Sequence, residues 1–113
     1  MEIKNISSIN LKYISSRKKT YEGRLNTGFW ANLKIGDSFI LKDEDNKSVC
    51  VKVSGLKYFN NFGDAWFVLG ERLIPHEICP TIHQRDAINF YRTYYNDEDV
   101  REYGVIAISL TIV

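Results

Sequence analysis

The C-terminal stretch YGVIAISLTIV, residues 103 to 113, limits the fold more than any other part of the sequence. From Val105 onward almost every residue is apolar, and several are β-branched. A strand with one face in water alternates apolar and polar residues, whereas a strand buried on both faces reads as a nearly continuous apolar run. This stretch therefore predicts the central strand of a sheet that other parts of the chain cover on both sides.

A β-hairpin is expected over residues 38 to 53. The segment SFILK is followed by the polar turn DEDN and then by Val49, Val51 and Val53 at alternate positions. This alternation is typical of a strand, and a short polar stretch between two such runs is typical of a hairpin turn. The middle of the chain thus supplies two antiparallel strands.

Four short segments have the apolar spacing or the capping residues of helices. One of them places Ala87, Ile88, Tyr91 and Tyr95 on a single face. The order of short helix, strand, hairpin, helices and closing strand indicates an α+β fold, a small mixed β-barrel with short flanking helices. The four predicted helices are residues 8–16, 62–70 with Gly70 at the end, 83–95, and 97–104 with Asn96 as the cap.

The length and composition are those of one globular domain, which we expect to span residues 1 to 113. Apolar residues make up 44% and charged residues 26% of the chain, so disorder is not expected. No window is apolar enough to span a bilayer, and the polar N-terminus lacks a signal-peptide core, so we expect a soluble, cytoplasmic protein without a membrane partner. Cys50 and Cys79 are too few for a disulfide framework and are expected to be small buried side chains.

Charge is distributed unevenly, although the net charge of the chain is only +1. Residues 2 to 24 carry a net charge of +4, and residues 64 to 104 carry −4. The positive charge is densest in RKKTYEGRL, residues 17 to 25, where basic residues surround a single acid, Glu22. A basic run is usually only a solvated surface. The asymmetry, however, can steer an anionic partner to one face of the protein.

The chain contains, in this order, the segments RKKTYEGRL, LKIGDSFIL, YFNNFGDAWFVLG and AINFYRTYYNDEDVREYGVIAISL. This combination resembles the ASCH (activating signal cointegrator homology) family of PUA-like domains, from about Lys12 to the C-terminus. The resemblance implies a PUA-like β-barrel whose cleft is lined by Lys19, Glu22 and Arg24. It also implies binding of RNA or another nucleic acid, with which the family is associated.

Some small bacterial ASCH proteins are amidohydrolases that remove the acyl group from N4-acetylcytidine, and the resemblance implies this activity as the alternative function. A lysine of those enzymes matches Lys19, whereas they hold threonine at the position of Glu22. In an enzyme of this kind, Lys19 and Glu22 would be the catalytic residues. Glu71 and Glu77 lie in the region where those enzymes carry a further catalytic glutamate.

The chemistry of the three motif residues is compatible with either use. In an extended segment Glu22 and Arg24 share a face, whereas Lys19 is out of phase and must enter from the preceding turn. Arg24 can hold a phosphate with two hydrogen bonds, and Glu22 can orient Arg24 and accept from an exocyclic amine such as that of cytosine. For hydrolysis, Lys19 would have to be partly neutral. We predict a module that binds RNA or a modified nucleoside or nucleotide, with deacylation as the alternative and a protein-interaction domain as the third possibility.

Two further groups of residues, the aromatic side chains and a set of histidines and a cysteine, have the composition of binding sites. Trp30 and Phe29, in a polar loop beside the basic motif, are the candidates for stacking on a base, with Trp30 as the binding residue, whereas Tyr91 and Tyr95 are expected to be core. His76, Cys79 and His83 have a spacing that could mimic a zinc site. Because no second Cys or His pair accompanies them, we expect a loop there, no metal and no cofactor.

Overall fold

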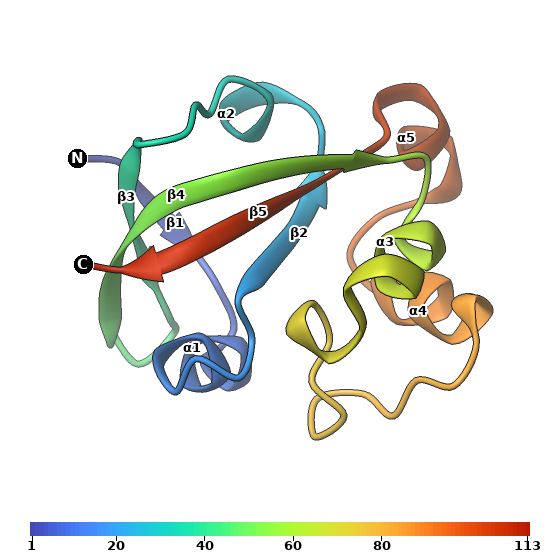
Figure 1. Ribbon diagram of the computed structural model, residues 1–113, viewed down its shortest axis with the longest axis horizontal. Helices are drawn as coiled ribbons and strands as arrows, with labels where there is room; N and C mark the ends of the chain where they lie inside the picture. Colours follow the sequence, from blue (N-terminus) through green and yellow to red (C-terminus); the bar gives the residue numbers. More distant parts are fainter.

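The computed structural model describes residues 1–113. It contains five strands, five α-helices and one 3-10 turn, coloured along the chain in Figure 1. In chain order these are β1 (Ile3–Asn5), α1 (Ser8–Ser15), β2 (Tyr21–Leu25), α2 (Gly28–Ala31), β3 (Ser38–Lys42), β4 (Ser48–Phe59), α3 (Phe62–Leu69), η1 (Gly70–Arg72), α4 (Gln84–Tyr91), α5 (Asp97–Tyr103) and β5 (Val105–Ile112).

The strands form one sheet in the order β1-β3-β4-β5-β2, with the predicted hairpin as β3 and β4. Only β1 and β3 are parallel. The long strand β4 contains a β-bulge between Val53 and Gly55, and a bulge bends a strand and increases its twist. The sheet is curled into a half-barrel, with β1 and β2 as its two edges (Figure 1). The expected α+β class, with a curled mixed sheet and short flanking helices, is confirmed.

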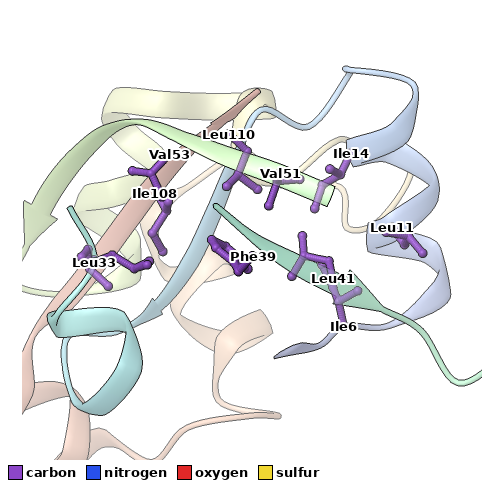
Figure 2. Packing of buried hydrophobic residues seen from close by; sticks show 11 residues of the cluster. Ile6, Leu11, Ile14, Leu33, Phe39, Leu41, Val51, Val53, Ile108 and Leu110 are labelled. Atoms are coloured by element: carbon purple, nitrogen blue, oxygen red, sulfur yellow. The ribbon is translucent and has the colours of Figure 1, made fainter. Parts of the chain in front are cut away.

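Strand β5 lies between β4 and β2 and is buried on both faces, as its apolar sequence predicts. Its alternate residues Ile106, Ile108 and Leu110 belong to a core inside the curl of the sheet. Val105 and Ala107 belong to a second core, which the sheet shares with α3 and α4. The first core contains Phe39 and Leu41 of β3, Val51 and Val53 of β4, Leu11 and Ile14 of α1, and Leu33 after α2 (Figure 2).

The four predicted helices are present, and the side chains of Ser7, Asn61 and Asn96 cap three of them. Helix α4 is shorter than predicted, because it ends at Tyr91 rather than Tyr95. The sequence did not predict β1, α2 or η1, which have only three or four residues each. Local patterns are weak in such short elements, and β1 is a strand because it pairs with β3. Both cysteines are only half-buried, and no helix is long and apolar enough to cross a membrane.

Candidate functional site

The basic motif lies on β2, an edge strand that pairs only with β5. Glu22 and Arg24 are two residues apart in this strand and therefore project from the same face. Lys19 lies in the turn before the strand begins and reaches Glu22 from there. The structure thus brings the three motif residues together in the way that their spacing predicts.

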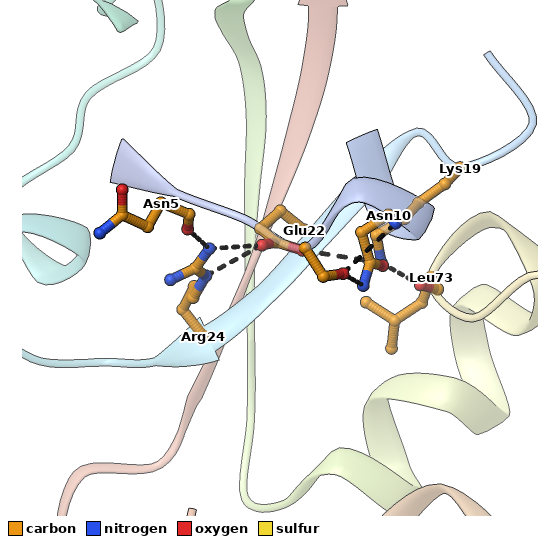
Figure 3. Close-up of polar contacts among 7 residues, drawn as sticks. Asn5, Asn10, Lys19, Glu22, Arg24 and Leu73 are labelled. Atoms are coloured by element: carbon orange, nitrogen blue, oxygen red, sulfur yellow. Dashed lines mark hydrogen bonds and ion pairs between the residues drawn. The ribbon is translucent and has the colours of Figure 1, made fainter. Parts of the chain in front are cut away.

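The Glu22 carboxylate lies between the two cations (Figure 3). Its Oε2 accepts hydrogen bonds from Arg24 Nε at 2.9 Å and lies 2.8 Å from Arg24 Nη2. Its Oε1 lies 3.7 Å from Lys19 Nζ. Lys19 and Glu22 are both buried, with 3% and 6% of their surface exposed. Charges are rarely buried to this degree unless they are paired, and here each charge has a partner of opposite sign.

Arg24 connects the two edges of the half-barrel. Its Nη2 donates a hydrogen bond of 2.9 Å to the carbonyl oxygen of Asn5, at the end of β1. Its guanidinium also lies 4.3 Å from the ring centroid of Trp30, within the range of a cation–π interaction. Trp30 in turn packs edge-to-face against Phe29 and Phe39. The orientation of Arg24 is therefore set by contacts on three sides.

Lys19 is the innermost of the three residues. Its Nζ donates a hydrogen bond to the carbonyl oxygen of Leu73, which follows η1 (Figure 3). Burial lowers the pKa of Lys19 below its usual value, and the attraction of the Glu22 carboxylate opposes this shift. Lys19 thus holds together β2, the turn before it and the segment after α3.

A cleft of about 150 Å³ opens over Glu22, Gly23 and Arg24. Its remaining walls come from the segment between β1 and α1 and from the C-terminal end of α4 and the residues after it. They consist of Asn5, Ile6, Ser7, Asn10, Phe90, Tyr91, Tyr94 and Tyr95. Neither Lys19 nor Trp30 lines this cleft. The two residues contact it through their partners, Lys19 through Glu22 and Trp30 through Arg24.

Tyr91 places a hydroxyl group at the floor of the cleft. Its ring is buried and stacks on Phe62, with the ring centroids 3.8 Å apart. The hydroxyl makes no hydrogen bond within the chain, is not sealed from solvent and lies beside Gly23, which lines the cleft with Tyr91. Burial raises the pKa of Tyr91 well above its usual value, and the charge of Glu22 raises it further. The hydroxyl therefore stays protonated and can donate to a ligand.

The close approach of Tyr91 explains the glycine in the YEGR motif. A Cβ atom at Gly23 would lie 3.0 Å from the Tyr91 hydroxyl oxygen and 3.2 Å from Leu73 Cδ1. Few Cβ atoms tolerate contacts this short, so any larger residue would displace Tyr91 or Leu73. Gly23 thus leaves the space that the Tyr91 hydroxyl occupies at the cleft floor.

The two other acids considered from the sequence lie elsewhere. Glu77 forms an exposed ion pair with Lys18, and Glu71 accepts a hydrogen bond from the backbone amide of His76. Neither lines the cleft. From the sequence, Tyr91 and Tyr95 are expected in the core, and nothing in it connects them with the site. The hydroxyl group of a buried tyrosine usually needs a hydrogen-bond partner. Only the tertiary structure, however, places the Tyr91 hydroxyl beside β2.

Two solved structures have this fold over nearly their whole length. The hypothetical protein PH0355 matches the chain with a TM-score of 0.82, covering 99% of this chain and 97% of that protein, at 26% identity. Protein PF0455 from Pyrococcus furiosus matches with a TM-score of 0.71, covering 99% of this chain and 96% of that protein, also at 26% identity. The sequence matches no family model and no curated protein.

A third solved structure carries a family name. ASCH from Zymomonas mobilis matches with a TM-score of 0.58 and 13% identity, covering 96% of this chain and 65% of that protein. At this level of identity the likeness concerns the fold alone. The chain therefore has the α+β fold of that ASCH structure, a half-barrel with flanking helices, as its sequence motifs predict.

Proposed function

We propose that this protein binds single-stranded RNA and takes one base of the strand into the cleft over Glu22, Gly23 and Arg24. The observation that carries the proposal is the buried Glu22 carboxylate, held between two cations at the floor of a small cleft with aromatic walls. Unpaired bases that proteins recognise are commonly stacked on aromatic side chains and hydrogen-bonded along their edges. Lys19 and Trp30 support the site by fixing Glu22 and Arg24.

Glu22 has acceptor capacity left for a ligand. Arg24 uses Oε2, whereas Oε1 lies 3.7 Å from Lys19 Nζ, beyond the length of a direct hydrogen bond. A carboxylate accepts from amines and cannot donate, so it favours a base with an exocyclic amino group over uracil, which presents a carbonyl there. The cleft is smaller than the roughly 300–1,000 Å³ of typical ligand pockets, so it suits a fragment of the size of one pyrimidine. Cytosine meets both conditions.

We expect the protein to bind an oligocytidine RNA of six nucleotides more tightly than the matching oligouridine, by about 10-fold, the order of one hydrogen bond to a charged group. Fluorescence anisotropy with labelled RNA would measure this ratio. Affinity for both should fall as salt is added, because phosphate contacts release counterions. Equal affinity for the two RNAs would contradict base recognition by Glu22. The absence of salt-sensitive binding to any RNA would remove the proposal altogether.

Deacylation of N4-acetylcytidine is the second candidate, favoured by one observation. Burial lowers the pKa of Lys19, as an amine that acts as a base or nucleophile requires. However, the Lys19 amino group is engaged by the Leu73 carbonyl and does not line the cleft. We therefore expect no release of cytidine from N4-acetylcytidine over hours at high protein concentration, measured by chromatography. Cytidine formation by the wild type but not by Lys19→Ala would reverse this preference.

A further inference from the structure

A second and larger cavity lies next to the base cleft. It has a volume of about 560 Å³ and shares only Tyr91 and Tyr95 with the cleft. Its walls come from the turn between β4 and α3, from α4, and from α5 with the residue that follows it. Besides the two shared tyrosines they consist of Asn60, Asn61, Phe62, Ile88, Arg92, Asp97, Val100, Arg101, Glu102, Tyr103 and Gly104.

The wall between the two cavities is aromatic. The ring of Phe62 is nearly parallel to those of both tyrosines, at 10° to Tyr91 and 8° to Tyr95, with centroids 3.8 Å and 5.5 Å away. Tyr91 is buried, and its hydroxyl lies beside Gly23 of the cleft. Tyr95 is only half-buried, so it can offer a surface to a planar ligand.

The polar groups of the second cavity are balanced in charge. Arg92 forms an ion pair with Asp97 at 3.0 Å. Arg101 and Glu102 add one unpaired charge of each sign, and Asn60 and Asn61 line the same cavity. The volume falls within the roughly 300–1,000 Å³ of small-molecule sites. Apolar and aromatic walls with a few amides and one free guanidinium are suited to a heteroaromatic group with polar edges.

We propose that this cavity is a second nucleoside subsite, which takes the nucleotide next to the one in the cleft. This inference rests on the proposed function and makes it more specific: the ligand is a strand of at least two nucleotides, whose adjacent bases lie on either side of Tyr91 and Tyr95. The shared tyrosines join the two cavities, and a single strand that enters one cavity is positioned to continue into the other. The balanced charge of the lining favours a base and ribose over a further phosphate.

Nuclear magnetic resonance titrations of the full chain can test this inference. The probes are cytidine, its 3′- and 5′-monophosphates, and the dinucleotide CpC. The amide of Gly23 reports on the cleft, and the amide of Gly104 reports on the second cavity. We expect cytidine to shift Gly23, and CpC to shift both glycines and to bind about 10-fold more tightly than either monophosphate, the order of one further base stack. The monophosphates control for the added phosphate.

Two variants locate the gain in affinity. Val100→Phe should fill part of the second cavity and reduce the affinity for CpC to the affinity for the monophosphates. The affinity for cytidine should stay unchanged, because Val100 does not line the cleft. Arg101→Ala changes an exposed side chain and should weaken the binding of CpC by several-fold. The control is Arg85→Ala, because Arg85 is an exposed arginine of α4 that lies outside both cavities, and its replacement should not change the affinity for CpC. Circular dichroism would confirm that each variant is folded.

The outcomes separate this inference from the function on which it rests. If cytidine shifts Gly23 but CpC binds no more tightly than the monophosphates and leaves Gly104 unmoved, the second subsite is wrong and the base cleft stands. If no probe shifts Gly23, the proposed function fails and the second subsite fails with it. A 10-fold gain that Val100→Phe abolishes supports both.

Discussion

Replacing Lys19 with methionine is expected to lower the free energy of unfolding by about 3–5 kcal/mol, the range measured when one partner of a buried ion pair is removed. The change leaves Glu22 Oε1 buried without its cation and the Leu73 carbonyl without its donor. Methionine has a similar length and fits buried space, so the loss reports on charge more than on packing. Since domains of this size are stable by roughly 5–15 kcal/mol, the variant should be clearly weakened in urea denaturation.

The neighbouring lysine is the matched control. Lys18 also pairs with a glutamate, Glu77, but both side chains are largely exposed. Exposed ion pairs contribute little to stability, so Lys18→Met should unfold at nearly the same urea concentration as the wild type. Equal effects of the two substitutions would show that the Lys19–Glu22 pair is not the buried support described above.

Replacing Glu22 with glutamine is expected to weaken the binding of oligocytidine RNA by about 10-fold, the order of one hydrogen bond to a charged group. Glutamine has nearly the same shape and keeps an oxygen that can accept from Arg24. It loses the charge, and with it the preference for an amino group at the cleft floor. The ratio of oligocytidine to oligouridine affinity should therefore approach one, as measured by fluorescence anisotropy.

The control for this variant is Glu77→Gln, which removes one negative charge far from the cleft lining. It should leave the cytidine preference intact. Circular dichroism of both variants distinguishes loss of binding from loss of fold. An unchanged cytidine preference in a folded Glu22→Gln protein would mean that another group reads the base, and the protonated Tyr91 hydroxyl would be the next residue to replace.

The larger elements could be predicted from the sequence because their patterns are local. The alternating valines of β4, the apolar run of β5 and the Asn96 cap of α5 each have a periodicity or a residue that favours one backbone conformation. Strand β1 has no such pattern. Its three residues form a strand because of parallel pairing with β3, and that partner lies far along the chain. Helix α2, with four residues, is likewise too short to show a period.

The sequence predicted only part of the candidate site. The spacing of Glu22 and Arg24 predicted a shared face, since residues two apart in a strand lie on one face, whereas Lys19 was placed beside them only by the family resemblance. It did not predict that Lys19 is sealed beneath Glu22, because this depends on the Leu73 carbonyl, 54 residues away. The ring of Tyr91 is part of the core, as the sequence predicted. The sequence did not predict that Tyr91 also lines the cleft.

The sequence by itself thus determined the fold class, the central position of β5 and the identity of the three charged residues on and before β2. Periodicity, capping and residue type act over a few neighbours and can be read along the chain. Only the tertiary structure decided which of those charges line the cleft, because burial and pairing depend on distant segments. The curl of the sheet brings Asn5 of β1 to Arg24 of β2, and the helices bring Tyr91 and Tyr95 over the same edge. The cleft arises from these long-range contacts.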